Sequence, residues 1–379
     1  IVLKNMKEFL TTAVFKLVVT ATAVIQFFLA TPKQTVTPPS PVHLSQIAQV
    51  QQIPEIVLPD PFSLLSPENF QVENVPAKKF LPLVPKKVAS RQNPVPQVAT
   101  SKPQILDPRL HGWDLTNAKI APAVVNIFCT LQTRNIIRTS TGSGVVIDPR
   151  GVILTNAHIA QYLLLADTAT NPKTDCAIRN GNPAKGNAFA KLLYISPAWI
   201  NAHGGDLLNP SPVGTGEHDY ALLMSNTRSF APLAHENTEP GEDTILAGYP
   251  SPFTSLSSRD NLNFLSVLTQ TEKTQGFRGN GDDLLYFGGS LLAERGSSGG
   301  PVINEDGKVL GILVTATPGI TVASRESRAI SASYIQKDFR EENGTSIQEF
   351  LSGDLNSARI NFMNQYGNSL GAKLLQNFN

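Results

Sequence analysis

The feature that most constrains this chain is the run Gly-Ser-Ser-Gly-Gly-Pro at residues 296–301, which lies between the apolar segments 284–287 and 309–314. A serine hydroxyl is a poor nucleophile. It reacts only where it stands clear of the backbone, meets a base, and has backbone N–H groups aimed at the developing oxyanion. The first glycine lets the chain bend, and the later pair keeps bulk away from a substrate carbonyl. We therefore expect a nucleophile turn with Ser298 as the reactive residue and the amides of Gly296 and Ser298 as the oxyanion hole. An ordinary Gly/Ser-rich surface turn is the alternative.

Two other motifs precede this turn. His158 follows the strand-like run 152–155, and Asp219 begins a strand-like segment that continues at residues 220–224. The order is His, Asp, Ser, with gaps of 61 and 79 residues, and it is one of three chain orders that give the same triad geometry. We expect His158 to be the general base and Asp219 to orient it. Asp206 is the weaker candidate for the acid, and purely structural roles are the alternative for both residues.

Together the three segments resemble those of the chymotrypsin-like (trypsin-like) serine proteases, and their style is closest to the bacterial Deg/HtrA-type peptidases. The resemblance covers roughly residues 107–335. It implies an all-β fold of two six-stranded antiparallel β-barrels and an endopeptidase that works through an acyl-enzyme intermediate. It implies neither cofactor nor metal. A protein of the same fold without catalytic activity, acting as a binding or envelope protein, is the competing hypothesis.

The resemblance also suggests where substrate side chains would bind. It places Leu292 at the base of the primary specificity pocket and Thr315 on its wall. Because no acid lies at the base and no histidine on the wall, we expect a small or medium apolar side chain to be preferred. Ser297 stands where zymogen-type relatives have an aspartate, so activation by insertion of a new amino terminus is not expected. No PDZ-like module is recognisable after Leu351, which favours a monomer that acts on polypeptide substrates.

Composition divides the chain in two. No glycine occurs before Gly112, whereas 15 of the 28 prolines lie between Pro32 and Pro108. We interpret residues 32–106 as a Pro-rich disordered linker that tethers the folded part, since closely spaced prolines favour extended geometry. A pro-segment that occupies the active-site cleft is the alternative. The net charge of +1 gives no reason to expect a nucleic-acid partner.

The amino end is typical of an export signal. The apolar run Leu17–Ala30 follows several lysines, so we interpret residues 1–31 as a signal peptide or a membrane anchor. Extended back to Phe9, the apolar run is long enough to span a bilayer, and residues 9–30 would then be the membrane tether. We therefore expect an exported protein, either secreted or membrane-anchored.

Short β-branched runs joined by Gly/Pro turns predict strands throughout residues 107–344, the expected protease domain. Barrel one covers about residues 120–224 and barrel two about 243–335. Residues 148–151 and 304–308 predict two hairpin turns. Only residues 345–379 are predicted to be helical, with an apolar stripe that ends at Phe378 and packs outside barrel two. Membrane or partner binding is the alternative use of that stripe.

The chain has two cysteines, Cys129 and Cys176. In an exported protein an even number of cysteines suggests a disulfide, which would brace barrel one. Two buried free thiols are the alternative. The six histidines are scattered, and we expect no metal site.

Overall fold

The computed structural model describes residues 110–378, apart from residues 134–136, 167–172, 209–214, 252–261, 317–320 and 322–323. The expected export segment and the Pro-rich linker therefore lie outside the described residues. None of the helices in the described part is long and apolar enough to cross a membrane.

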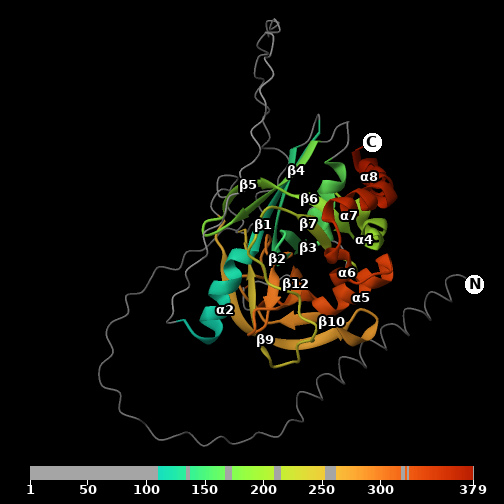
Figure 1. Cartoon of the computed structure of the whole chain (residues 1–379). Coiled ribbons are helices and arrows are strands. Elements are labelled where there is room, and N and C mark those ends of the chain that lie inside the picture. Colours follow the sequence, from blue (N-terminus) through green and yellow to red (C-terminus); the bar gives the residue numbers. More distant parts are fainter. Residues whose placement is uncertain are drawn as a thin grey trace, which may run out of the picture. The chain divides into compact units, whose positions relative to one another are not determined.

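The first half of the described chain forms a seven-stranded antiparallel sheet (Figure 1). The order of its strands is β5-β4-β1-β2-β3-β7-β6. Their bounds are β1 Val124–Gln132, β2 Ile137–Asp148, β3 Val152–Thr155, β4 Lys173–Asn180, β5 Lys185–Phe189, β6 Lys191–Ile195 and β7 Ala221–Met224.

This sheet differs from the predicted six-stranded barrel, because no ladder between described residues joins its edge strands β5 and β6. The two strands are nevertheless consecutive in the chain, and only Ala190 separates them. Residues 188–195, whose mostly apolar composition is typical of one strand, are therefore divided between two strands. β5 pairs with β4 at one edge and β6 pairs with β7 at the other, so the chain itself crosses between the edges at Ala190.

The second half forms a closed six-stranded barrel, as the sequence predicted. Its strand order is β10-β13-β12-β11-β8-β9, and β9 pairs with β10 to close it. The strands are β8 Asp243–Gly248, β9 Leu265–Gly276, β10 Gly279–Phe287, β11 Pro301–Ile303, β12 Val309–Ala316 and β13 Ser327–Ser331.

Both predicted hairpin turns are confirmed. The Gly151 N–H donates to the Asp148 carbonyl over 2.9 Å, and this turn joins β2 to β3. The Gly307 N–H donates to the Asn304 carbonyl over 3.0 Å between β11 and β12. Gly151 has φ +88°, a conformation that favours glycine.

Helices are not confined to the carboxyl end, so that prediction was wrong. Ser196 caps α4 by accepting a hydrogen bond from the Trp199 N–H, and a proline at the first helical position suits the start of this helix. The helical elements before β7 are α2 Gly112–Ile120, η2 Ala121–Ala123, α3 Ala157–Ala160, η3 Gln161–Leu165, α4 Pro197–His203 and η4 Gly204–Asp206.

The carboxyl end is helical, as predicted. Ser346 and Glu349 form a capping box at the start of α6, and Asp354 caps α7. The elements are α5 Ala332–Asn343, α6 Ile347–Ser352, α7 Leu355–Phe362, η7 Met363–Gly367, α8 Asn368–Leu375 and η8 Gln376–Phe378.

The apolar stripe of these helices does not cover barrel two, and that prediction was wrong. α7 packs on β6 of the seven-stranded sheet, and α8 packs on the helical elements η3, η4 and α4 of the same half of the chain (Figure 1). The Leu374 Cδ2 atom lies 3.3 Å from where a Gly204 Cβ would stand, and the Asn377 side chain donates to the Gly204 carbonyl over 2.8 Å. A helical stripe shows which face is buried but not which surface it meets.

Candidate active site

His158 and Asp219 meet at the end of the seven-stranded sheet. His158 lies on α3, directly after β3, and Asp219 lies just before β7, which pairs with β3. The His158 Nδ1 and Asp219 Oδ2 atoms are 2.7 Å apart, and the His158 backbone N–H donates to Asp219 Oδ1 over 2.9 Å. The Asp219 carboxylate therefore holds both the ring and the backbone of His158. Asp206, the weaker candidate, ends η4.

Asp219 is buried and only 3% exposed, and its own main chain is held as well. Its N–H donates to the Gly216 carbonyl over 3.1 Å, and its carbonyl accepts from the Asn156 side chain over 2.9 Å. Asn156 also precedes α3, so the residue before the helix is tied to the acid. The orientation of this carboxylate is fixed from both sides.

The turn that carries Ser298 comes from the barrel and is tied to β2 of the other sheet. The Ser143 N–H donates to the Ser298 carbonyl over 2.7 Å, and the Ser143 hydroxyl donates to the Gly296 carbonyl over 2.7 Å. A Cβ on Gly299 would lie 2.1 Å from the Ser143 carbonyl oxygen and 2.4 Å from Thr155 Oγ1. Because Thr155 lies only three residues before His158, this close approach brings the serine turn to the histidine end of the sheet.

Two backbone donors in this turn have no hydrogen-bond partner within the described ranges. Among the hydrogen bonds between described residues, none uses the N–H of Gly296 or that of Ser298. Gly296 has φ +94°, and a Cβ there would lie 2.6 Å from the Tyr249 carbonyl oxygen, so only glycine fits. Unpaired amides on a turn of this kind are suited to binding an anionic oxygen.

The two adjacent serines differ in their surroundings. The Ser298 hydroxyl donates to the Val314 carbonyl over 3.4 Å, and no hydrogen bond in the described part of the chain links it to His158. The Ser297 hydroxyl is buried and has no hydrogen-bond partner among the described residues. Ser298 is thus the serine whose hydroxyl has only a long contact, and a rotation about its side-chain torsion would release it.

The residues expected to bind substrate remain predictions. Leu292 is 2% exposed and belongs to the apolar cluster inside the barrel, together with Leu285 and Phe287. Its Cδ2 atom lies 3.5 Å from the position of a Gly248 Cβ. Thr315, in β12, pairs with Arg328 of β13, and the side chain of Thr315 is not among the parts that the structure describes.

Cys129 and Cys176 are joined by a disulfide and face one another on the paired strands β1 and β4. The Cys129 Sγ atom lies 3.6 Å from the carbonyl oxygen of Ile159, the residue after His158. The bridge therefore contacts the helix that carries the histidine.

Sequence reasoning missed a second polar cluster behind Asp219. His218, Asp338 and Glu342 place their ligand atoms within 4.8 Å of one another. Glu342 already accepts hydrogen bonds from the hydroxyls of Ser196 and Tyr220, so its oxygens are engaged, and we assign no metal there. The histidine beside the acid was visible in the sequence, but its partners lie about 120 residues further along the chain.

Ser143 is the other residue that was missed. It is fully buried, and its hydroxyl accepts from the Tyr249 N–H over 2.9 Å while donating to Gly296. Its place in Gly142-Ser143-Gly144, the start of an apolar strand, was the only signal in the sequence.

The match to a family profile and to two serine protease relatives agrees with the class of site that this geometry defines. The family profile described as a trypsin-like peptidase domain matches residues 142–312. Serine protease HTRA1A of Danio rerio is 28% identical over 211 residues, which cover 54% of this chain and 37% of that protein. Serine protease HTRA1 of Xenopus tropicalis is 30% identical over 211 residues, which cover 54% of this chain and 38% of the relative. A solved serine endoprotease from Yersinia pestis is 21% identical, with a TM-score of 0.39, and the match covers 60% of this chain and 66% of that one.

The chain thus resembles the chymotrypsin-like serine proteases of the HtrA type and matches the trypsin-like peptidase profile over residues 142–312, as the sequence motifs predicted. The match spans well under half the length of the HTRA1 relatives.

Proposed function

We propose that this domain is a serine endopeptidase in which His158, Asp219 and Ser298 form the triad. The observation that carries the proposal is that the Asp219 carboxylate accepts hydrogen bonds from both the ring and the backbone N–H of His158. The nucleophile turn is tied to the same end of the sheet, and two of its amides have no partner among the residues that the structure describes.

In this mechanism His158 Nε2 takes the Ser298 proton as the hydroxyl oxygen attacks the substrate carbonyl. Asp219 accepts a hydrogen bond from Nδ1, which leaves Nε2 as the basic nitrogen of the neutral ring, and it stabilises the imidazolium that forms. The N–H groups of Gly296 and Ser298 bind the oxyanion. The imidazolium then protonates the leaving amine, which leaves an acyl group on Ser298, and water attacks that ester in a second round of the same chemistry.

The Ser298 rotamer favours a specific alternative, a protein of this fold without catalytic activity. In that case the long contact to the Val314 carbonyl would be the permanent state of the hydroxyl. Under the proposal it is a resting state, and the hydroxyl rotates toward His158 when substrate binds, since catalytic hydrogen bonds are often poorly aligned in the free enzyme.

The test is labelling with a fluorophosphonate probe, followed by mapping of the modified peptide. We expect the label on Ser298, and we expect Ser298→Ala to lower peptide cleavage by several orders of magnitude. The matched control is Ser297→Ala, which changes the adjacent serine and should retain most of the activity. Equal losses in the two variants, or a label on Ser297, would contradict the assignment. An unlabelled, inactive and folded wild-type protein would favour the alternative without catalytic activity.

We also propose a preference for small or medium apolar side chains, because Leu292 would supply an uncharged pocket base. A library of peptides that differ at one position tests this. Preferred cleavage after Arg, Lys or Glu would contradict it.

The tether proposed for residues 9–30, and with it an exported and monomeric enzyme, rests on the sequence pattern alone. A reporter fused after residue 31 and scored for export tests the location.

A further inference from the structure

The residue before the triad acid has a strained backbone. His218 has φ +61°, and among the described residues it is the only non-glycine residue with a positive φ. This region disfavours side chains with a Cβ, so a residue stays in it only where its surroundings hold it. The strain occurs directly beside Asp219, which makes it relevant to the site.

The strained residue forms part of the turn that aims Asp219. The Tyr220 N–H donates to the His218 carbonyl over 2.9 Å, and the Asp219 N–H donates to the Gly216 carbonyl over 3.1 Å. Relaxation of His218 to a negative φ would rotate the following peptide unit. It would therefore turn the Asp219 carboxylate away from the two nitrogen atoms of His158.

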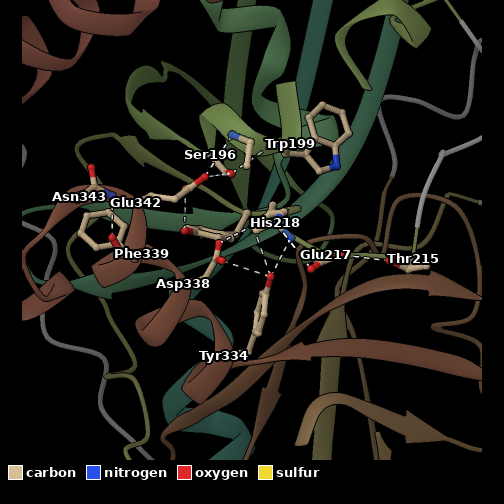
Figure 2. Close-up of polar contacts among 12 residues, drawn as sticks. Ser196, Trp199, Thr215, Glu217, His218, Tyr334, Asp338, Phe339, Glu342 and Asn343 are labelled. Atoms are coloured by element: carbon tan, nitrogen blue, oxygen red, sulfur yellow. Dashed lines mark hydrogen bonds and ion pairs between the residues drawn. The ribbon is translucent and has the colours of Figure 1, made fainter. Parts of the chain in front are cut away.

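Helix α5 holds His218 in this conformation. His218 Nδ1 lies 2.9 Å from Asp338 Oδ2, and the His218 backbone N–H donates to the Tyr334 hydroxyl oxygen over 3.4 Å. The Tyr334 hydroxyl in turn donates to Asp338 Oδ1 over 3.4 Å. In Figure 2 the Tyr334 hydroxyl lies between His218 and Asp338, and both α5 side chains reach toward the loop.

Helix α5 also forms a hydrogen bond with Tyr220, the residue that follows Asp219. Glu342, one turn beyond Asp338, accepts hydrogen bonds from the Tyr220 hydroxyl over 3.2 Å and from the Ser196 hydroxyl over 2.8 Å. It also accepts one from the Ala198 N–H at the start of α4 over 3.2 Å. α5 therefore contacts the residues on both sides of Asp219 and is anchored to a neighbouring helix.

We propose that His218 and Asp338 are positioning residues for the triad, through which α5 fixes the turn that aims Asp219 at His158. This inference rests on the proposed function. Neither residue touches the reacting atoms, and both act through Asp219.

Charge supports this arrangement. The carboxylates that face His218 are Asp338 and Glu342 from α5 and Glu217 from its own loop, and Glu217 is also paired with Arg278. The hydrogen bond that the His218 ring donates to the Asp338 carboxylate is the main cause that raises the pKa of His218, against the opposing effect of burial. Protonation of the His218 ring to the imidazolium form thus strengthens its hydrogen bond to Asp338 on α5.

The test uses Asp338→Asn, which keeps the shape and removes the charge, and His218→Gly, which permits a positive φ and removes the imidazole. We expect each variant to lower kcat at least tenfold, about 1.4 kcal/mol, with KM within twofold of wild type. The acid limb of the kcat/KM profile should shift, because it reports the base in the free enzyme. The NMR resonance of the His158 Nδ1 proton should broaden through faster exchange with water.

The matched control is Glu341→Gln, which removes a charge from an exposed position of the same helix and should leave all of these values unchanged. The double variant of His218 and Asp338 should be no worse than the poorer single variant, since the two residues act as one unit. Tyr334→Phe is the milder variant if His218→Gly does not fold. It removes only the hydroxyl and keeps the ring against Phe277.

The proposal is overturned if folded Asp338→Asn and His218→Gly retain the wild-type kcat, acid limb and His158 resonance. It is also overturned if they change only the melting temperature, because that marks a purely structural role. Failure of the proposed function is distinguishable. In that case the wild type neither cleaves peptides nor reacts with the probe, whereas the His158 resonance still reports the positioning.

Discussion

Replacing Ser143 by alanine should destabilise the protein and impair the site together. Its buried hydroxyl accepts from the Tyr249 N–H over 2.9 Å and donates to the Gly296 carbonyl over 2.7 Å. Ser143→Ala leaves both backbone groups without that partner, and each buried unsatisfied group costs about 1–3 kcal/mol. We expect a loss of about 2–4 kcal/mol in the free energy of unfolding. In a domain of this size this corresponds to a fall in melting temperature of roughly 5–12 °C.

The chain offers a matched control in a second buried serine. The Ser297 hydroxyl has no hydrogen-bond partner in the part of the chain that the structure describes, so Ser297→Ala removes an unsatisfied polar atom and should leave stability unchanged or slightly raised. The two substitutions delete the same atom from two buried serines, one hydrogen-bonded to the Gly296 carbonyl and the other next to Gly296 in the chain. Any difference between them therefore measures the hydrogen bonds and not the removal of a hydroxyl.

The assay is urea unfolding of both variants at one pH, with peptide cleavage measured well below the melting temperature. Gly296 carries one of the proposed oxyanion donors, so Ser143→Ala should also lower kcat about tenfold or more. This loss should be smaller than the loss in kcat on removing that donor entirely. Equal unfolding midpoints for the two variants would refute the reasoning. So would a Ser143→Ala variant that is destabilised but fully active, since the hydroxyl would then have no part in holding the turn.

Three further predictions follow from individual contacts. Cys129→Ala should cost about 2–4 kcal/mol of stability and lower turnover, because the bridge touches the residue after His158. Melting curves and cleavage rates should show both losses, and reductant should add nothing further. Glu349 accepts the N–H of its helix cap, which lowers its pKa to about 2, so it stabilises the fold above pH 4.5 and loses this effect as pH falls toward 2. Glu349→Gln should flatten the acid dependence of urea unfolding in that window. The pKa of His218 is raised chiefly by Asp338, so this pair stabilises the fold fully below pH 6.5 and less as pH rises through the raised value. An NMR titration of the His218 ring should give a lower pKa in Asp338→Asn.

Much of the fold could be predicted because its signals are local. The strands of the barrel are short apolar runs, and the two hairpin turns contain the glycines that their backbone requires. Asp219 and His158 were found as neighbours of such strands, and the structure places their side chains in contact. For these residues the sequence motif and the hydrogen-bonded geometry point to the same arrangement.

The predictions failed where a local sequence pattern does not show which other element the segment pairs with or packs against. The run over residues 188–195 has the composition of one strand, but its two halves pair with opposite edges of a curled sheet. The stripe of α8 predicts a buried face equally well for either sheet, and only the packing of Leu374 against Gly204 decides between them. Ser143 and Asp338 are isolated polar residues whose importance comes from contacts more than 100 residues away.

The arrangement separates the three residues of the proposed triad by origin. His158 and Asp219 belong to the seven-stranded sheet, Ser298 belongs to the barrel, and Ser143 links the two halves. A weakened barrel should therefore displace the nucleophile and leave the histidine–aspartate pair intact, whereas a displaced α5 should do the reverse. Because the two kinds of damage reach the site through different residues, probe labelling at Ser298 and the His158 resonance should fail independently of each other. Variants of Ser143 and Asp338 are the pair in which this independence can be measured.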